Sequence, residues 1–256
     1  MKLLAIETGT QTLSVALAHA GGGAPQLWQT SGAGGAQAST TLIGIVLDLL
    51  RQADLRLSQL DALCFGAGPG SFTGLRTACA VAQGLAFGAG IPVLPVDSLL
   101  ALAEEARARA LPGQPQCEVT ALLDARMNEI YAARYAYSHG HWTTLQAATL
   151  LAVPALGQTD WAQQAPAAGT SWLLAGNVFA EYAEQLALDA ATPRLAALPT
   201  ASAMLRLAPQ LLQAGLGLPA AQALPRYIRD KVAQTSAERS AQKAAARAAA
   251  APAARS

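Results

Sequence analysis

A glycine-rich stretch between an apolar segment and a helical pattern places the strongest constraint on how this chain folds. It reads GAGPGSFTGLR from Gly66 to Arg76, after the largely apolar segment 60–65. Its glycines permit positive φ angles and the close approach of a second backbone, and Ser71 or Thr73 can cap a following helix. The pattern therefore predicts a strand, a tight loop and a helix that ends near Phe87.

Two interpretations of this loop compete. Bare amides at the start of a helix suit an anion such as phosphate, but the same glycines suit backbone packing. A P-loop needs a lysine, and lysine occurs only at positions 2, 231 and 243. The GxGxG spacing does not match the dinucleotide fingerprint, and Ser71 lacks the flanking glycines of a hydrolase elbow. The loop is thus better explained as a tight strand-to-helix turn, in which Arg76 is a candidate partner or ligand contact.

Around the loop, one order of elements is predicted twice, as βββαβα. The first series places strands at 3–6, 13–17, 26–29, 60–65 and 91–96, and helices at 39–51, capped by Ser39 or Thr40, and 74–87. The second places strands at 119–123, 129–137, 141–150 and 172–175, and helices at 159–164, 178–188 and 200–211. The duplication predicts an α/β fold with domains at 1–98 and 99–230.

A helix after Ser98 is expected to connect the two series, with Glu104 and Glu105 on its solvated face. An extended segment at 224–229 is expected to return to the body. Residues 231–256 form an Ala/Arg-rich tail, expected to be flexible, with five basic residues against one acidic residue. Since the whole chain has a net charge of +1, the body is slightly acidic, which argues against a broad phosphate-binding surface there.

Composition indicates a globular protein, with 52% hydrophobic and 13% charged residues over 256 positions. Its apolar runs are shorter than the about 20 residues that span a bilayer, and Glu7 interrupts the N-terminal run. We therefore expect a cytoplasmic protein without a membrane partner. Cys64, Cys79 and Cys117 lack CxxC spacing, which predicts reduced, buried thiols.

Glu7 and Asp124 end the first strand of each series. A carboxylate in such a turn can orient phosphate or metal-bound water, or it can cap the backbone, and both interpretations remain open. The three histidines, His19, His139 and His141, have no helical metal-binding spacing. The sequence therefore predicts neither a metal site nor a catalytic residue.

The helices at 39–51 and 74–87 have features of a docking surface. The first is apolar over a wide arc, and the second carries small residues that permit a close helix contact. The predicted docking residues are Leu42, Ile45, Val46, Leu49, Leu75, Ala78, Ala82 and Leu85.

Several blocks resemble the bacterial TsaB (YeaZ) family. These blocks are 4–10 with 14–17, 68–76 with 83–86, 124–131, and 198–201 with Met204, Pro225, Tyr227 and Arg229. The resemblance covers roughly residues 2–233 and implies two ribonuclease-H-like domains of the actin, sugar-kinase and Hsp70 superfamily. It also implies a role in forming threonylcarbamoyladenosine next to the anticodon of tRNA.

The resemblance further implies a noncatalytic subunit without its own cofactor. It would dock a catalytic TsaD-like subunit through the helices at 39–51 and 74–87, join a TsaE-like ATPase, meet tRNA through the complex, and form a homodimer when alone. ATP or ADP is possible at the partner interface, and the candidate nucleotide or ligand residues are Glu7, Thr8, Arg76 and Asp124. The alternative is an active ATP-dependent phosphotransferase of the same superfamily that uses Glu7 and Asp124.

Three positions depart from the family pattern. Glu7 stands where the family often has Asp, and Ala38-Ser39 stands where it often has His followed by Ser or Thr. Only Gly176 remains of the paired glycines in the superfamily's adenosine loop.

Overall fold

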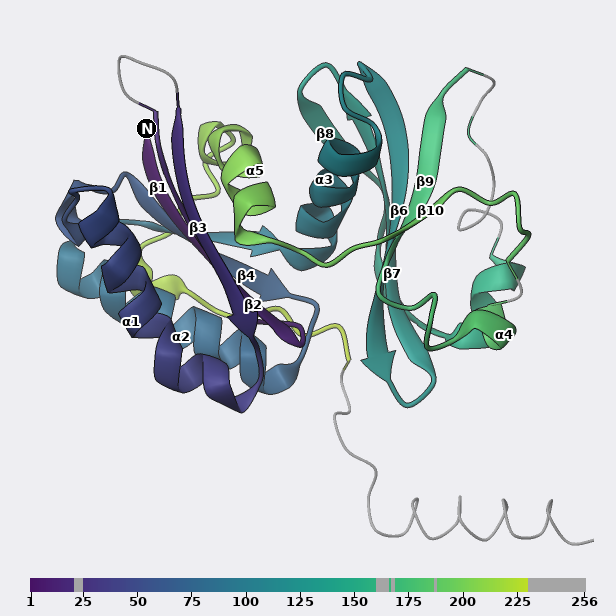
Figure 1. The fold of residues 1–256 in the computed structure, drawn as a ribbon, viewed down its shortest axis with the longest axis horizontal. Coiled ribbons are helices and arrows are strands. Elements are labelled where there is room, and N and C mark those ends of the chain that lie inside the picture. Colours follow the sequence, from purple (N-terminus) through teal and green to yellow (C-terminus); the bar gives the residue numbers. More distant parts are fainter. Residues whose placement is uncertain (21–24, 160–165, 167–168, 187, 230–256) are drawn as a thin grey trace, which may run out of the picture. The chain divides into compact units, whose positions relative to one another are not determined.

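Two mixed β-sheets, each with five strands, form the framework of the chain (Figure 1). The computed structural model describes residues 1–20, 25–159, 166, 169–186 and 188–229. The chain divides into two units, Met1–Arg226 and Tyr227–Ser256, and both sheets belong to the first. The predicted tail at 231–256 lies outside the described residues, and the predicted domain boundaries remain predictions.

The first sheet has the strand order β3-β2-β1-β4-β5. Its strands are β1 (Lys2–Glu7), β2 (Thr12–His19), β3 (Gln26–Ala33), β4 (Ala62–Gly68) and β5 (Val93–Asp97). The pairs β1–β2 and β2–β3 are antiparallel, whereas β1–β4 and β4–β5 are parallel.

The second sheet repeats this topology. Its strands are β6 (Gln116–Arg126), β7 (Glu129–Ser138), β8 (His141–Ala152), β9 (Ser171–Gly176) and β10 (Arg194–Ala196). Read from β8, the order is β8-β7-β6-β9-β10, with antiparallel pairs on one side of β6 and parallel pairs on the other. The predicted duplication is therefore confirmed, and each half has the ribonuclease-H-like arrangement of strands.

Helices cover both faces of the first sheet. The α-helices are α1 (Ala36–Gln52), α2 (Phe72–Ala89), α3 (Ser98–Ala110), α4 (Ala183–Leu186) and α5 (Ala201–Gln213). Strand alternation divides the core: Leu4 and Ile6 pack with α1 and α2, whereas Leu3 and Ala5 pack with α5. The 3-10 helices are η1 (Leu57–Gln59), η2 (Val153–Gln158) and η3 (Ala220–Gln222).

Two helices cross over between the sheets. Helix α5 follows the strands of the second sheet but packs on the first, and α3 follows β5 and packs on β6, β7 and β9 while it also contacts β4 and β5. The two helices lie side by side (Figure 1). After α5, the segment 214–226 also joins the first sheet, since Val93 and Leu218 exchange backbone hydrogen bonds of 2.9 and 2.8 Å. The expectation that 224–229 returns to the body is met by Arg226, whose N–H donates to the Ala67 carbonyl at 2.7 Å.

The predicted helices of the second half have different outcomes. The helix expected at 178–188 is wrong in extent: the structure has a turn in which Val178 and Tyr182 are buried in the core, followed by a helix at Ala183–Leu186. Of the helix expected at 159–164, residues 160–164 lie outside the described residues, and η2, before them, was not predicted. The three residues of β10 are too few for a hydrophobic period to show.

The predicted cap of the first helix is also wrong. Helix α1 begins at Ala36, after Gly35 with a φ of 67°, and has no side-chain cap. Thr40 is the fifth residue of the helix, and its hydroxyl donates to the Gln37 carbonyl at 2.9 Å. The helix begins earlier than predicted because the chain turns directly after β3, where the Gly34 N–H donates to the Gln11 carbonyl at 2.9 Å.

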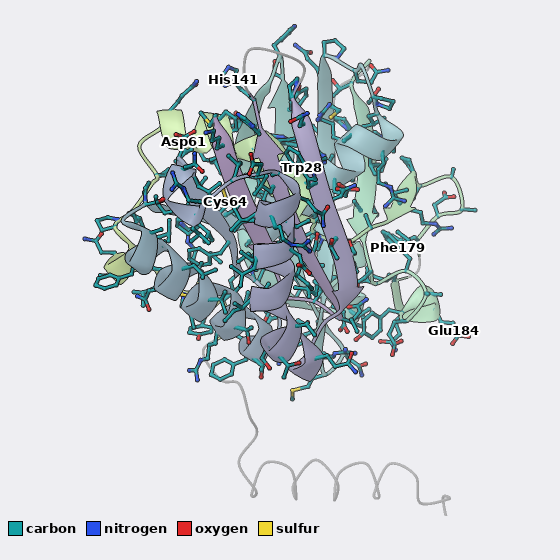
Figure 2. The ribbon with its side chains drawn as sticks, turned by 60° about the vertical axis from the view of Figure 1, so that its left-hand side comes forward. Trp28, Asp61, Cys64, His141, Phe179 and Glu184 are labelled. Atoms are coloured by element: carbon teal, nitrogen blue, oxygen red, sulfur yellow. The ribbon has the colours of Figure 1, made fainter. Side chains whose placement is uncertain are left out.

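The three cysteines are buried free thiols, as predicted. Cys64 lies in β4 (Figure 2), where burial raises the pKa of its thiol to about 12. Within the described part of the chain, no helix has both the length and the apolar character needed to cross a membrane.

Candidate functional site

Glu7, at the end of β1, is a fully buried carboxylate with partners from two directions. One oxygen accepts a hydrogen bond from the Gly9 N–H at 2.6 Å. The other accepts from the Ser98 hydroxyl at 2.9 Å, at the start of α3. Both oxygens are thus bonded within the chain, so Glu7 links the β1–β2 turn to α3.

The glycine loop fits closely against the same turn, and we call this contact the loop interlock, formed by residues 7–9 and 66–74. A Cβ atom at Gly66 would overlap the Glu7 carboxylate, and one at Gly74 would overlap the Thr8 carbonyl oxygen. At Gly70, a Cβ would lie 2.6 Å from the Gly9 carbonyl oxygen. Each of these glycines is therefore required by a close approach of the chain to itself.

Hydrogen bonds join the two sides of the loop interlock. The Ser71 N–H donates to the Gly9 carbonyl at 2.7 Å, and the Thr8 hydroxyl donates to the Gly74 carbonyl at 2.7 Å. Ser71 caps α2 as predicted, since its hydroxyl oxygen accepts from the Gly74 N–H at 3.4 Å. Because the Ser71 and Gly74 amides and the three glycines already serve these contacts, backbone packing accounts for the loop without a phosphate.

Burial raises the pKa of Glu7 above its ordinary value, although hydrogen bonds from Gly9, Ser98 and Thr8 oppose this shift. Asp97, the N-cap of α3, adds to the rise through its negative charge. Burial raises the pKa of Asp97 as well, while its hydrogen bonds to Leu100 and Leu99 lower it. Two acidic groups with raised pKa values thus lie where β1, β5 and α3 meet.

Asp124 occupies the equivalent position at the end of β6, but its surroundings differ. Its carboxylate accepts from the Tyr182 hydroxyl at 2.9 Å and from the Arg126 N–H at 2.7 Å. The Asn177 side chain accepts from the Asp124 N–H at 2.9 Å. Asp124 therefore caps its own turn and anchors the segment after β9.

The turn after Asp124 has an unusual backbone. Arg126, Met127 and Asn128 have φ angles of 63, 59 and 58°, three consecutive left-handed residues without a glycine. The sequence predicted a turn here, but side-chain periodicity carries no signal for this conformation.

The structure corrects the choice of docking residues. Six of the eight lie in the core of the first sheet with almost no exposure: Leu42, Val46, Leu49, Leu75, Ala78 and Ala82. Ile45 and Leu85 are half-buried against the same core. A helix that is apolar all round does not reveal which stripe its domain buries.

The opposite side of the two helices is exposed and partly apolar. The exposed fractions are 48% for Ile43, 53% for Leu47 and 74% for Phe87. At the start of α2, the Arg76 guanidinium lies 3.7 Å from the centre of the exposed Phe72 ring. We define the exposed α1–α2 face as the surface formed by Ile43, Leu47, Phe72, Arg76 and Phe87 together with the exposed small residues between them.

The remaining candidates divide between buried and exposed positions. Thr8 is buried and Arg76 is exposed, so their roles as ligand residues remain predictions. Among the described residues, no group of three His, Cys, Asp or Glu side chains is placed to hold a metal ion.

Glycines in α2 provide a matched pair for testing the loop interlock. We expect Gly74→Ala to destabilise the chain by about 1–3 kcal/mol or more, because its methyl group meets a fixed carbonyl oxygen. Gly84→Ala enters open space and is expected to stabilise the same helix by about 0.5–1 kcal/mol. Urea unfolding of both variants measures the difference, and shifts of the same sign would refute the interlock.

The raised pKa of Glu7 predicts a pH effect with a defined sign. The folded chain holds this proton more tightly than the unfolded chain, so wild-type stability falls as pH rises from about 4.5 through the folded-state pKa. Glu7→Gln has no carboxyl group to titrate, so its free energy of unfolding should rise relative to that of wild type between pH 4.5 and the folded-state pKa of Glu7. Below pH 4.5 the difference between the two proteins should not change. Urea unfolding from pH 4 to 8 measures the trend, with exposed Glu181→Gln as the control; a constant difference would contradict the prediction.

Comparison with known proteins agrees with this geometry. A model of the family described as TsaD, tRNA N6-adenosine threonylcarbamoyltransferase, matches residues 34–237. The tRNA threonylcarbamoyladenosine biosynthesis protein TsaB of Haemophilus influenzae is 39% identical over 131 residues, which are 51% of this chain and 52% of that protein. TsaB of Escherichia coli is 29% identical over 240 residues, 91% of this chain and 96% of that protein.

A solved structure extends the match to the fold. YeaZ from Pseudomonas aeruginosa is 33% identical with a TM-score of 0.72, and the alignment covers 88% of this chain and 99% of that one. The family model and the solved structure thus both cover most of this chain. The chain belongs to the TsaB (YeaZ) family of tRNA threonylcarbamoyladenosine biosynthesis proteins.

Proposed function

We propose that this chain is a noncatalytic subunit in the formation of threonylcarbamoyladenosine next to the anticodon of tRNA. Its task is to dock and support a TsaD-like catalytic subunit through the exposed α1–α2 face. A TsaE-like ATPase joins the assembly, tRNA is met through the complex, and two copies pair when no partner is present. The chain carries no cofactor of its own, ATP or ADP belongs to the partner interface, and the complex works in the cytoplasm.

The observation that carries this proposal is a set of helical glycines with no internal reason to be glycine. A Cβ atom at Gly44 in α1, or at Gly84 or Gly88 in α2, would meet nothing within 4 Å. A glycine inside a helix costs about 1 kcal/mol relative to alanine. Beside exposed Leu47 and Phe87, such glycines are explained by a second protein that approaches the helix backbones closely.

The alternative, an active phosphotransferase, finds less support. It assigns chemistry to Glu7 and Asp124, but the Glu7 carboxylate is fully buried and both its oxygens are bonded within the chain. Asp124 is engaged by Arg126 and Tyr182. Neither carboxylate is presented to a substrate, which favours the docking role.

Reconstitution tests the proposal. The purified chain, a TsaD-like subunit and a TsaE-like ATPase are combined with tRNA and the threonylcarbamoyl adenylate precursor system, and modified adenosine is measured by mass spectrometry. We expect modification only when both the chain and the TsaD-like subunit are present. Modification by the chain alone would overturn the noncatalytic assignment, and full activity without the chain would overturn the supporting role.

Two leucines of similar exposure provide a docking test. Leu47→Asp places a charge on the exposed α1–α2 face and is expected to weaken binding of the TsaD-like subunit at least tenfold, about 1.4 kcal/mol. Leu145→Asp, on β8, is the control, because the two leucines are 53% and 50% exposed. Calorimetric titration measures both affinities, and equal affinities of the two variants would place docking elsewhere.

Gly84 allows the close approach to be tested without disturbing the fold. A leucine at this position enters open space in the isolated chain, so we expect Gly84→Leu to retain the wild-type unfolding midpoint or exceed it. The same side chain would hold a partner helix away and reduce complex formation. Unfolding and analytical ultracentrifugation with the TsaD-like subunit measure both properties, and unchanged complex formation would remove Gly84 from the interface.

A further inference from the structure

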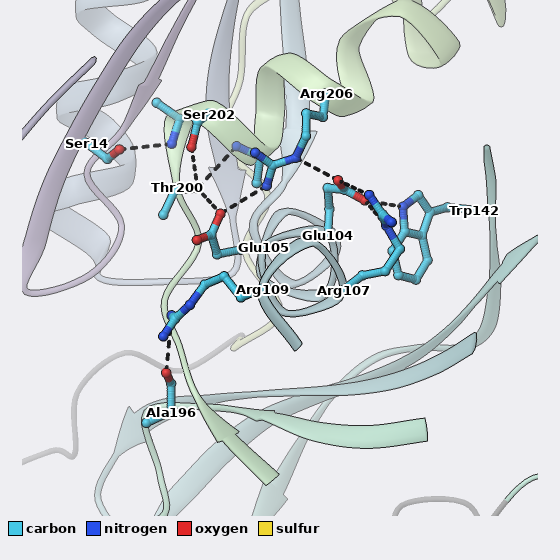
Figure 3. Close-up of polar contacts among 12 residues, drawn as sticks. Ser14, Glu104, Glu105, Arg107, Arg109, Trp142, Ala196, Thr200, Ser202 and Arg206 are labelled. Atoms are coloured by element: carbon cyan, nitrogen blue, oxygen red, sulfur yellow. Dashed lines mark hydrogen bonds and ion pairs between the residues drawn. The ribbon is translucent and has the colours of Figure 1, made fainter. Parts of the chain in front are cut away.

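The contact between α3 and α5 contains a polar cluster that the docking role does not use. Helix α5 packs on the first sheet, whereas α3 packs mainly on the second and also contacts β4 and β5, so the contact between the two helices joins the two sheets. We call the first sheet with α1, α2 and α5 the first lobe, and the second sheet with α3 and α4 the second lobe. Glu104 lies at the centre of the cluster (Figure 3).

Glu104 was expected on a solvated helix face, but its side chain is only 3% exposed. It accepts hydrogen bonds from three residues on three elements. Arg107 of α3 donates from Nε and Nη2, both at 2.9 Å. Arg206 of α5 donates from Nε at 2.7 Å, and Trp142 of β8 donates from its indole N–H at 3.0 Å.

Arg206 makes a second contact across the same boundary. Its Nη2 lies 3.0 Å from a carboxylate oxygen of Glu105, and that oxygen also accepts from the Thr200 hydroxyl at 2.9 Å. Thr200 is the N-cap of α5, and the Ala201 N–H donates to the Ser14 hydroxyl of β2 at 3.0 Å (Figure 3). The contacts run without a break from the second sheet through α3 and α5 to the first.

Burial decides how much this cluster matters. Exposed ion pairs contribute little to stability, whereas a buried carboxylate that loses one of its partners loses part of the compensation for its burial. Separation of α3 from α5 would take Arg206, whose side chain is 38% exposed, away from Glu104 and leave the carboxylate with Arg107 and Trp142 as its partners. Burial alone would raise the pKa of Glu104, but hydrogen bonds from Arg107 and Arg206 outweigh it, so this pKa lies below its ordinary value.

The first turn of α3 is also fixed by hydrogen bonds. Ser98 donates to Glu7, and the Asp97 carboxylate caps the Leu99 and Leu100 N–H groups at 2.8 and 3.2 Å. Asp97 is also hydrogen-bonded to Tyr135 of β7. Helix α3 is therefore tied to both lobes at its first turn and again at Glu104.

We propose that Glu104, with Arg206 and Trp142, forms an interlobe lock that fixes α3 against α5 and prevents the two lobes from closing or rotating about each other. The lock does not depend on the proposed function. It makes the chain a rigid body, in which a partner bound to the first lobe finds the second lobe at a constant position.

Distance measurements between spin labels test the lock in the full chain. Cysteines introduced at the exposed positions Gln52 in α1 and Glu184 in α4 take the labels, since the native thiols are buried. Wild type should give one narrow distance distribution. Arg206→Met removes both contacts of Arg206 with the acidic pair, while the Thr200–Glu105 hydrogen bond and the contacts within α3 remain, and it should broaden the distribution or shift its mean.

Two further variants keep the result interpretable. Glu104→Gln should broaden the distribution at least as much as Arg206→Met, because it leaves two guanidinium groups without their shared carboxylate. Arg51→Met removes an exposed ion pair with Asp48, whose side chains are 77% and 63% exposed, and should leave the distribution unchanged. If Glu104→Gln does not fold, Arg206→Met decides alone; a wild-type distribution in this variant, or a broad one in wild type, overturns the lock.

Discussion

The burial of the Glu7 carboxylate beneath the glycine loop is the constraint on which the rest of the structure depends. A charged group of this size needs partners when it leaves water, and the chain supplies the Gly9 amide and the Ser98 hydroxyl. The space for its oxygens exists because position 66 has no side chain. A single side chain thus explains a glycine far along the sequence and the position at which α3 begins.

The same arrangement determines where α2 lies. Gly70 and Gly74 touch the backbone of the β1–β2 turn, and Ser71 caps the helix while its N–H bonds to Gly9. With its first turn fixed in this way, α2 buries Leu75, Ala78 and Ala82 and leaves Phe87 exposed. The position of the exposed α1–α2 face is therefore a consequence of contacts made by buried residues on the opposite side of the helices.

Sequence patterns identified the duplicated order of strands because continuous apolar segments such as Leu3 to Ile6 reflect burial on both faces of a sheet. They placed Ser71 as a cap because capping is local. They failed where the answer depended on distant segments. Arg206 lies 102 residues from Glu104, so two adjacent glutamates resembled a solvated helix face. Likewise, Leu42 and Leu47 look equivalent in sequence, yet only Leu42 meets the sheet.

The contacts of Glu7 and those of Glu104 meet in α3, and they link the interior of the chain to the proposed docking role. The first turn of α3 contacts Glu7 through Ser98, and its second turn contacts α5 through Glu104. A displacement of the glycine loop would therefore act on α3, and through α3 on the second lobe. A protein that pressed on the exposed α1–α2 face would meet resistance from both sets of contacts. Stiffness of this kind suits a subunit that supports a catalytic partner, because none of the binding free energy is then lost in ordering the support.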